Sequence, residues 1–381
     1  MRWITLFLSI ILVIPGFSIP NRGQAQEISV PEVSARAAAV IDVPSGRILY
    51  QKEADKRMRI ASLTKVMTAI VAIEEGDLDQ KVKVGPGAVG VEGSSIYLKQ
   101  GERISLEHLL YGLMLRSGND AAVAIAEHIG GSLEGFVYMM NEKARYLGLQ
   151  GTHFENPHGL DAPHHYSTAS DMARLTAYAL KNPKFRQIVS TPVKTVPWPG
   201  EDWHRKWYNK NKMLRLYPGA DGVKTGYTKR SKRTLISSAT RDGRQLATVT
   251  LNAPDDWDDS MHLLEYGFQR FQALEVIRKG ETMADVPADG PRRKEEWRVV
   301  ASSGFSYPLT DQEQDRIKVV PVITYPLSRV DREGMRVGTA RVYLDEEPIG
   351  SVPLVTKTTQ AEDTVFTDWW SVLARVLGRG G

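Results

Sequence analysis

A serine and a lysine three residues apart stand at the start of an otherwise apolar segment. In IASLTKVMTAIVAIEEG, residues 60–76, Ser62 and Lys65 are followed almost only by apolar or small residues. That composition is typical of a helix buried on most sides, and positions i and i+3 of a helix share one face. A serine hydroxyl needs a neighbour that accepts its proton before it is a good nucleophile. Burial disfavours a lysine cation, so Lys65 is a candidate general base for Ser62.

Two further triplets strengthen this interpretation. S-x-x-K alone is weak, because average composition predicts roughly one or two chance matches in a chain of this length. Here it occurs once, and Ser117-Gly118-Asn119 and Lys224-Thr225-Gly226 follow it. Each triplet is expected by chance on the order of 0.1 times per chain. The order S-x-x-K, S-x-N, K-T-G marks the penicillin-recognising serine enzymes.

The sequence therefore resembles the low-molecular-mass penicillin-binding proteins, the serine-type D-alanyl-D-alanine carboxypeptidases of bacterial cell walls. The resemblance covers most of the chain and includes residues 112–132, 153–161 (HFENPHGLD) and 222–228 (GVKTGYT). It implies a penicillin-binding/β-lactamase-like transpeptidase fold, with helices around an antiparallel sheet and a small all-β domain after it. It also implies a peptidoglycan stem peptide ending in D-Ala-D-Ala as substrate, and covalent binding of β-lactam antibiotics. A vegetative and a sporulation-associated branch of the family both stay open.

The resemblance assigns a role to each motif residue. Ser62 would attack the peptide carbonyl between two terminal D-alanines and form an acyl-enzyme, while Lys65 accepts the serine proton. Ser117, with Lys224 beside it, would relay a proton to the leaving amine, and Asn119 would hold the substrate's amide. Water would then hydrolyse the ester, and neither a metal nor an organic cofactor takes part.

The resemblance also implies a substrate-binding set on the late strand. The backbone N–H groups of Ser62 and Tyr227 would hold the oxyanion, and such donors are typically worth several kcal/mol. Lys224 and Thr225 would bind the terminal carboxylate. Gly226 has no side chain and so lets a substrate backbone approach the strand closely.

One stretch departs from the family pattern. Family members often carry an arginine after the late strand pair, where it helps to bind the carboxylate. The corresponding residues here, NAPDDWDDS at 252–260, are acidic. Either Arg230 or Arg233 substitutes for it, or Lys224 and Thr225 suffice.

The composition suits a globular protein, and the N-terminal segment predicts export. The chain has 381 residues, 42% of them hydrophobic, and no cysteine, which excludes disulfides and thiolate chemistry. An apolar run from Ile4 to about Ile14 follows Arg2 and precedes small residues, so residues 1–25 are interpreted as a secretory signal peptide, with a retained anchor as the alternative. Ten basic residues lie between Arg205 and Arg233. They predict a positive electrostatic field that attracts an anionic substrate or cell surface rather than nucleic acid, with a solvated basic face as the alternative for most of them.

Periodicity predicts the elements that position the motifs. Two strands span 37–52, helices cover about 62–76, 106–114, 119–129, 133–147 and 170–180, and a hairpin joins 234–240 to 246–251 through Arg-Asp-Gly. A helix over 261–274 would close the domain. Strands from both ends of the chain then share one sheet covered by helices, an α/β or α+β arrangement.

The remainder divides into two parts. Alternating apolar residues predict a small all-β domain at 277–358, after a peptidase domain at 26–276. Residues 359–381 hold an amphipathic segment with two tryptophans that is too short and polar to span a membrane. Such a segment lies in the membrane interface or, alternatively, docks on the β domain or a second subunit.

Four other functions share parts of this pattern. A β-lactamase needs a glutamate that activates water, and Glu155 is the candidate, although it stands at a variable position of the carboxypeptidase-like pattern. A zinc peptidase would use the histidine-rich stretch 158–165, whose spacing matches no standard zinc helix and which Pro163 interrupts. A D,D-transpeptidase would keep the same fold and motifs. A penicillin sensor would share the fold but have a degenerate site, and the intact motifs argue against it.

Overall fold

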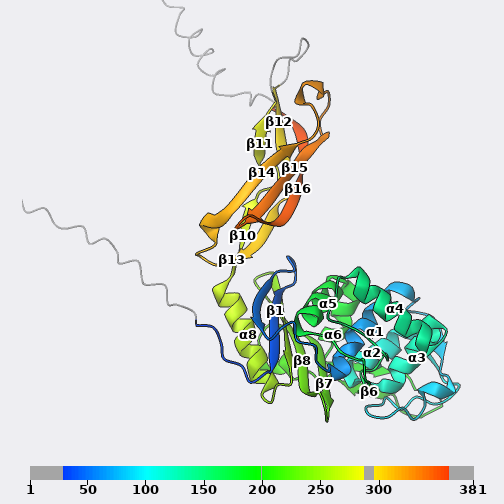
Figure 1. The fold of residues 1–381 in the computed structure, drawn as a ribbon. Helices are drawn as coiled ribbons and strands as arrows, with labels where there is room; N and C mark the ends of the chain where they lie inside the picture. Colours follow the sequence, from blue (N-terminus) through cyan, green and yellow to red (C-terminus); the bar gives the residue numbers. More distant parts are fainter. Residues whose placement is uncertain (1–28, 199, 287–295, 360–381) are drawn as a thin grey trace, which may run out of the picture.

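The computed structural model describes residues 29–198, 200–286 and 296–359. The expected signal peptide and amphipathic tail lie outside the described residues. Within them, a helical region and an elongated β-rich region are joined end to end (Figure 1). No helix in these ranges is both long and apolar enough to cross a bilayer.

One antiparallel sheet forms the centre of the first region. Its strand order is β2-β1-β9-β8-β7, so strands from the two ends of the region are neighbours. The strands are β1 (Ala37–Asp42), β2 (Ile48–Lys52), β7 (Ala220–Thr228), β8 (Lys232–Arg241) and β9 (Arg244–Leu251). The strands predicted at both ends of the region and the hairpin through Arg-Asp-Gly are confirmed. β7 is an edge strand of this sheet, so its outer backbone groups are available to a ligand.

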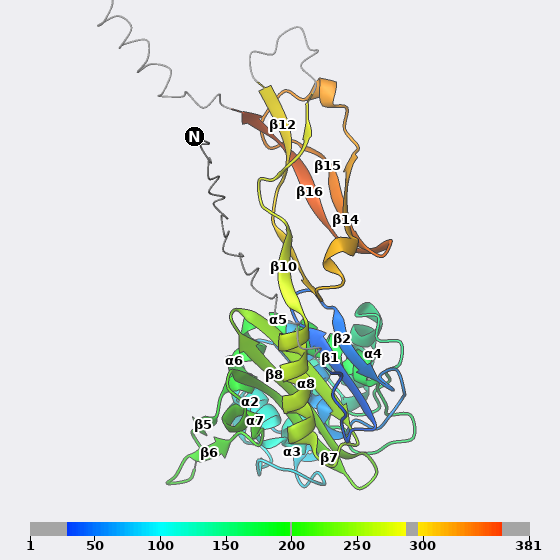
Figure 2. The ribbon, with the colours of Figure 1, turned by 90° about the vertical axis from the view of Figure 1, so that its left-hand side faces the viewer.

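Helices cover both faces of the sheet. One face is covered by a helical layer that shares one core, in which α5 and α6 contact the strands most: α1 (Lys65–Glu75), α2 (Leu106–Arg116), α3 (Asn119–Gly130), α4 (Leu133–Tyr146), α5 (Ala169–Lys181) and α6 (Pro183–Ser190). The other packs against α7 (Met213–Leu216) and α8 (Asp256–Arg270), and Figure 2 shows α8 lying across the strands. Alternation along β1 explains both cores: Ala37, Ala39 and Ile41 face the helical side, while Ala38 and Val40 face α8.

Two short strand pairs complete this region. β3 (Lys81–Lys83) pairs with β4 (Arg103–Ser105), and β5 (Val193–Val196) pairs with β6 (Arg205–Tyr208). Two 3-10 turns, η1 (Ala61–Thr64) and η2 (Pro86–Ala88), also belong here. Ser62 therefore lies in a 3-10 turn and Lys65 begins α1, whereas the sequence predicted one helix. Residues i and i+3 eclipse each other in a 3-10 turn, so the pair still meets.

The helix predicted over 261–274 is wrong at both ends. α8 begins at Asp256, and its three first-turn aspartates favour the positive end of a helix dipole. It ends at Arg270, because Phe271 is extended and the chain continues into β10 (Gln272–Ile277), which pairs with β13 (Phe305–Leu309). The β-rich region thus includes residues from 272 onward rather than from 277.

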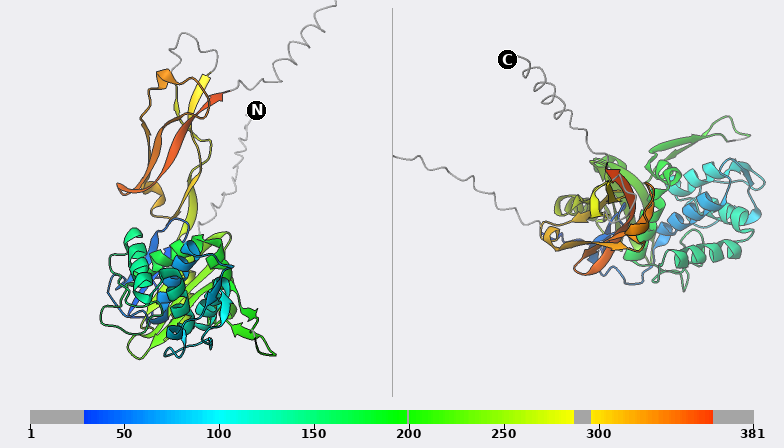
Figure 3. Two further views of the ribbon diagram at one scale, coloured as in Figure 1. Left: turned by 90° about the vertical axis from the view of Figure 1, so that its right-hand side faces the viewer. Right: turned by 90° about the horizontal axis from the view of Figure 1, so that it is seen from above.

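The β-rich region consists of that pair and a five-stranded sheet in the order β11-β12-β16-β15-β14. These strands are β11 (Thr282–Asp285), β12 (Glu296–Ala301), β14 (Ile317–Ile323), β15 (Arg336–Leu344) and β16 (Glu347–Thr359), with 3-10 turns η3 (Gln314–Arg316) and η4 (Leu327–Arg329). They enclose a core of their own. Figure 3 shows the region standing on the end of the helical region that carries β1 and β2.

Arg47, in the β1–β2 turn, ties the two regions together. Its guanidinium forms an ion pair with Glu313 and lies 5.3 Å from the ring centre of Phe271 and 5.2 Å from that of Tyr307. Its side chain is 16% exposed. A charge-assisted bond that is shielded from solvent in this way fixes the orientation of the β-rich region.

Candidate active site

The amine of Lys65 lies within hydrogen-bond distance of the hydroxyl of Ser62. Lys65 Nζ is 3.0 Å from Ser62 Oγ, 2.7 Å from Asn119 Oδ1 and 2.7 Å from the carbonyl oxygen of His158. Lys65 is fully buried, and burial, then the charges of Lys224 and Lys210, holds its pKa well below the usual range. A neutral amine has two N–H donors and one lone pair. The donors match Asn119 and His158, which leaves the lone pair for the Ser62 proton.

The turn that carries Ser62 is held by a loop almost one hundred residues further along the chain. Ala61 has a φ of +46°, and a Cβ on Gly159, whose own φ is +89°, would lie 1.9 Å from the Ala61 carbonyl oxygen. Only glycine permits this approach. His165 Nε2 lies 2.8 Å from Thr64 Oγ1, which donates to the Ala61 oxygen at 2.9 Å. The serine turn is thus fixed from outside its own helix.

The histidines of this loop are structural groups. Burial lowers the pKa of His158 to about 3 and that of His165 to about 4. The Glu155 backbone N–H donates to His165 Nδ1 at 3.0 Å, so neutral His165 carries its proton on Nε2 and donates it to Thr64. Within the described ranges, no three metal-ligating side chains gather at one point.

The second triplet forms one wall of the site. Ser117 ends α2 in a left-handed conformation, φ +64°, and is 5% exposed. The Asn119 N–H donates to the Ser94 carbonyl oxygen at 2.7 Å. The Asp120 carboxylate accepts the Ile96 N–H at 3.0 Å. The loop between η2 and β4 is therefore part of this wall, although none of the three motifs includes it.

The third triplet forms the opposite wall, on the edge strand β7. Lys224 is 1% exposed, and burial, then the charge of Lys210, lowers its pKa to about 7. Its ammonium donates to the Thr225 carbonyl oxygen at 2.7 Å. A Cβ on Gly226 would lie 3.1 Å from the Ser62 backbone nitrogen. Glycine thus lets β7 lie directly beside the nucleophile turn, and the following Tyr227 is 64% exposed.

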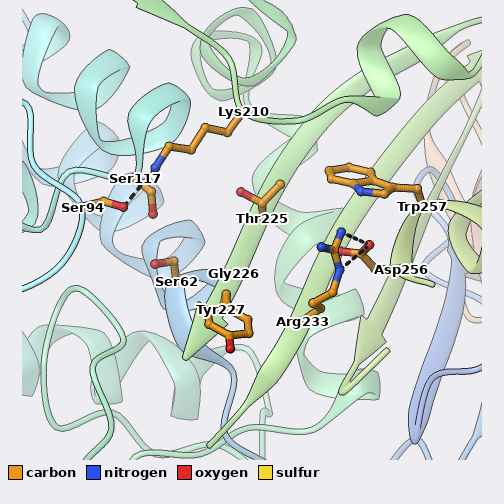
Figure 4. Close-up of a pocket in the computed structure, with 10 residues that line it drawn as sticks. All are labelled: Ser62, Ser94, Ser117, Lys210, Thr225, Gly226, Tyr227, Arg233, Asp256 and Trp257. Atoms are coloured by element: carbon orange, nitrogen blue, oxygen red, sulfur yellow. Dashed lines mark hydrogen bonds and ion pairs between the residues drawn. The ribbon is translucent and has the colours of Figure 1, made fainter. Parts of the chain in front are cut away.

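A cavity of about 530 Å³ lies between the two walls. Figure 4 shows Ser62 and Ser117 on one side and Thr225, Gly226 and Tyr227 on the other. That volume lies in the range of small-ligand sites. The structure therefore brings the three triplets together around one space, with Ser62 facing it. The complete lining is Ser62, Ser94, Ser117, Lys210, Thr225, Gly226, Tyr227, Arg233, Asp256 and Trp257.

Comparison with known proteins places the chain in a family. The family model of peptidase S11, described as D-alanyl-D-alanine carboxypeptidase, matches residues 24–255. The chain belongs to the peptidase S11 family. The model of the C-terminal domain of penicillin-binding protein 5 matches residues 271–362. The recognition of a low-molecular-mass penicillin-binding protein and its fold class are confirmed.

Individual S11 relatives span nearly the whole chain. D-alanyl-D-alanine carboxypeptidase DacF of Bacillus subtilis is 30% identical over 98% of this chain and 97% of its own. D-alanyl-D-alanine carboxypeptidase DacC of Escherichia coli is 31% identical over 91% of this chain and 89% of its own. Among solved structures, penicillin-binding protein 5 of Haemophilus influenzae is 28% identical, with a TM-score of 0.71 over 86% of this chain and 98% of its own.

The cavity of this S11 chain includes an arginine, one of the two that the sequence offers as partners of the carboxylate. Arg233, on β8, lines the cavity with Asp256 and Trp257. Its Nε donates to Asp256 Oδ1 at 3.0 Å, and its guanidinium carbon lies 5.9 Å from the ring centre of Trp257. Asp256 is 3% exposed, and burial raises its pKa although Arg233 opposes this. Asp256, from the acidic stretch that replaces the family arginine, thus holds Arg233 in place.

Glu155 does not reach the cavity. Its carboxylate accepts the backbone N–H of His164 at 2.7 Å, which closes the histidine loop on itself. The lining contains Asp256 as a carboxylate but not Glu155. Its position agrees with a structural role rather than that of a water-activating glutamate.

Proposed function

We propose that this chain removes the terminal D-alanine from peptidoglycan stem peptides through an acyl-enzyme on Ser62. The observation that carries the proposal is the buried Lys65 amine, 3.0 Å from the hydroxyl of Ser62, a residue that lines the cavity. Membership of the D-alanyl-D-alanine carboxypeptidase family supports the substrate, and supports β-lactams as covalent inhibitors. The chain is a serine hydrolase that works on the bacterial cell wall.

In the acylation step, Ser62 Oγ bonds to the carbonyl carbon of the penultimate D-alanine. Neutral Lys65 takes the hydroxyl proton, and its bonds to Asn119 and His158 keep the amine aimed at Oγ. The backbone N–H groups of Ser62 and Tyr227 donate to the carbonyl oxygen and stabilise the negative charge that develops on it. The close contact of Gly226 with the Ser62 nitrogen supports this placement, because it sets β7 beside the serine turn.

In the second half of acylation, the C–N bond breaks and the leaving amine takes up a proton. Ser117 lines the cavity and delivers that proton, and Lys224, able to gain or lose a proton near neutrality, replaces it. The proton that Lys65 took from Ser62 then restores the one that Lys224 gave up, so Lys65 is neutral again. Water attacks the ester carbon, Lys65 takes one proton from the water, and Lys65 returns that proton to Ser62 Oγ as the ester C–O bond breaks. The carboxyl end of the shortened peptide is released.

Arg233 is the proposed partner of the substrate's terminal carboxylate, together with Thr225. Both line the cavity, with Arg233 on the side away from Ser117 and Thr225 between them (Figure 4). Asp256 engages Nε and one terminal nitrogen of Arg233, which leaves the other terminal nitrogen for a ligand. Arg230 lies outside the cavity lining, so it is not used in this assignment.

Transpeptidation is the second candidate, because an acceptor amine and water compete for the same ester. One solved S11 neighbour, a variant of a Streptomyces DD-transpeptidase, is 34% identical with a TM-score of 0.60 over 63% of this chain and 99% of its own. Adding glycine as an acceptor during turnover distinguishes the two activities. A carboxypeptidase releases the shortened free acid, whereas a transpeptidase diverts most product to the glycine adduct.

Labelling with a fluorescent penicillin tests the proposed nucleophile. Wild-type chain should be labelled on the peptide that contains Ser62, as mass spectrometry of the digest would show. Ser62→Ala should stay unlabelled, whereas Ser94→Ala, at another cavity serine, should be labelled. Equal labelling of Ser62→Ala and wild type would contradict the assignment of Ser62 as the nucleophile.

The location of the enzyme follows from its substrate, which lies outside the cytoplasm. We assign residues 1–25 to export and residues 359–381 to attachment at the outer face of the cytoplasmic membrane. The apolar spacing of that tail supports an interfacial helix. Deletion of residues 363–381 should release the chain from sedimenting anionic vesicles with activity intact. Continued sedimentation would show that the tail is not the anchor.

A further inference from the structure

Lys210 lies on a short segment between β6 and α7 whose backbone is fixed by its two neighbours. The side-chain amide of Asn209 donates to the carbonyl oxygens of Val189 at 3.0 Å and Thr191 at 3.1 Å. Its oxygen accepts the N–H of Asn211, which is 3% exposed, at 2.9 Å. The asparagines anchor the segment, and Lys210 lines the cavity. None of the three motifs contains it.

Lys210 makes hydrogen bonds to two residues that adjoin Ser117 in sequence or in space. Its backbone N–H donates to the Leu115 carbonyl oxygen at 3.1 Å, and its ammonium donates to Ser94 Oγ at 3.0 Å. Ser94 in turn accepts the Asn119 N–H through its carbonyl oxygen. Figure 4 shows the Lys210 side chain passing above Ser117 to reach Ser94. A serine at φ +64° needs such external support, because the left-handed conformation is unfavourable for a residue with a Cβ.

The Lys210 charge also acts on the two buried lysines. Burial and then the Lys210 charge lower the pKa of Lys224 to about 7. Burial, then Lys224, then Lys210 lower the pKa of Lys65. The other charged or titratable groups that face Lys65 come from α3 and from the loop before α5: Asp120, His158 and His165. Of these, Asp120 opposes the effect on Lys65. Arg116, on α2, faces Lys210 itself.

We propose that Lys210 is a positioning residue of this site, which holds Ser117 through Leu115 and Ser94 and favours the neutral form of Lys65 by its charge. The proposal deepens the proposed function and rests on it, since it needs Ser117 as proton relay and Lys65 as base. Lys210 is exposed at the cavity mouth. Its electrostatic effect is therefore open to screening by salt, unlike the effect of burial.

The test compares Lys210→Met, Lys210→Arg and Ser94→Ala in the full chain. Lys212→Met is the matched control, because Lys212 is an exposed lysine of the same segment outside the cavity lining. The readouts are kcat/KM for D-alanine release from pH 5.5 to 10, β-lactam acylation of Ser62, and Tm. Lys210→Met should lower kcat/KM at neutral pH roughly tenfold. It should move the acidic limb of the profile to higher pH, because loss of a positive charge favours the lysine cations. Activity should then recover in alkali.

Lys210→Arg should keep both the rate, within about threefold, and the position of the limb, since it keeps charge and donors. Ser94→Ala should lower the rate without moving the limb. A wild-type profile for Lys210→Met would overturn the proposal. A loss of kcat/KM that Lys210→Arg does not restore would also overturn it. A loss in which the acidic limb of the pH profile stays at the wild-type position would do the same. No D-alanine release by wild type, with Ser62 still acylated, would instead contradict the proposed function.

Discussion

The carbonyl oxygen of Ala61 lies directly against the Cα of Gly159, so closely that a Cβ at position 159 would be 1.9 Å from it. This contact joins the turn of the nucleophile to the loop whose His158 carbonyl holds Lys65. The geometry of the serine–lysine pair therefore depends on Gly159, a residue with no reactive side chain. The first prediction tests that dependence.

Gly159→Ala should displace the serine turn and lower the rate of Ser62 acylation at least roughly tenfold. Gly148→Ala is the control, because Gly148 has a similar positive φ of +69° but nothing within 4 Å of the added Cβ. The control carries only the backbone cost of about 1–2 kcal/mol. Stopped-flow acylation and thermal unfolding of both variants provide the comparison. Equal acylation rates would show that the contact is unimportant.

Lys65→Met should remove most acylation, roughly a hundredfold or more, because it removes the base while filling the same buried space. The fold should persist, since a methionine avoids the cost of burying an ammonium. Acylation rates of the two proteins across pH 6–10 measure this. In wild type the rate should fall as pH drops through the lowered pKa of Lys65. A variant with an unchanged rate would mean that another group takes the Ser62 proton.

Arg233→Gln should weaken substrates with a free terminal carboxylate, with kcat/KM down roughly tenfold to a hundredfold. A thioester lacking that carboxylate should be turned over at the wild-type rate, because the chemistry at Ser62 is untouched. Arg230→Gln, at an exposed arginine outside the lining, is the control. If Arg233→Gln slowed both substrates equally, Arg233 would have a structural role instead.

Acid should destabilise the protein through the two buried histidines. Their pKa values are about 3 and about 4 when folded, against about 6.5 when unfolded. Below pH 6.5 the unfolded state binds more protons, so the free energy of unfolding falls as pH drops toward 4. For His165 alone the loss is on the order of 3 kcal/mol.

Urea unfolding at pH 7 and at pH 4.5 measures this loss. His165→Gln should flatten the dependence, whereas His262→Gln, at an exposed histidine, should leave the slope unchanged. A slope identical in wild type and His165→Gln would rule out His165 as the source.

The sequence predicted the parts of this site that are local. Ser62 and Lys65 are three residues apart, and the two later triplets mark their own wall residues, so spacing alone was sufficient. Element type also followed wherever periodicity was strong, as in α3 and the β8–β9 hairpin. The end of α8 was missed because the apolar residues after Arg270 continue an acceptable helical pattern, and pairing with β13 makes them a strand.

The contacts that orient the motif residues could not be predicted. His158 and Lys65 are 93 positions apart, and His165 and Thr64 are 101 apart, so only the tertiary fold brings them together. Lys210 was one of ten similar basic residues until the structure placed it in the cavity. In sequence alone the histidine-rich loop suggests zinc ligands, whereas in the structure its carbonyl, glycine and neutral imidazole support the serine turn.

The most direct test of the account is D-alanine release from diacetyl-lysyl-D-alanyl-D-alanine, with wild type measured beside Ser62→Ala. The account predicts release by wild type and none above background by Ser62→Ala, with the same Tm for both. Release by both proteins would contradict the role of Ser62. Absence of release by a wild type that still binds penicillin at Ser62 would contradict carboxypeptidase activity itself.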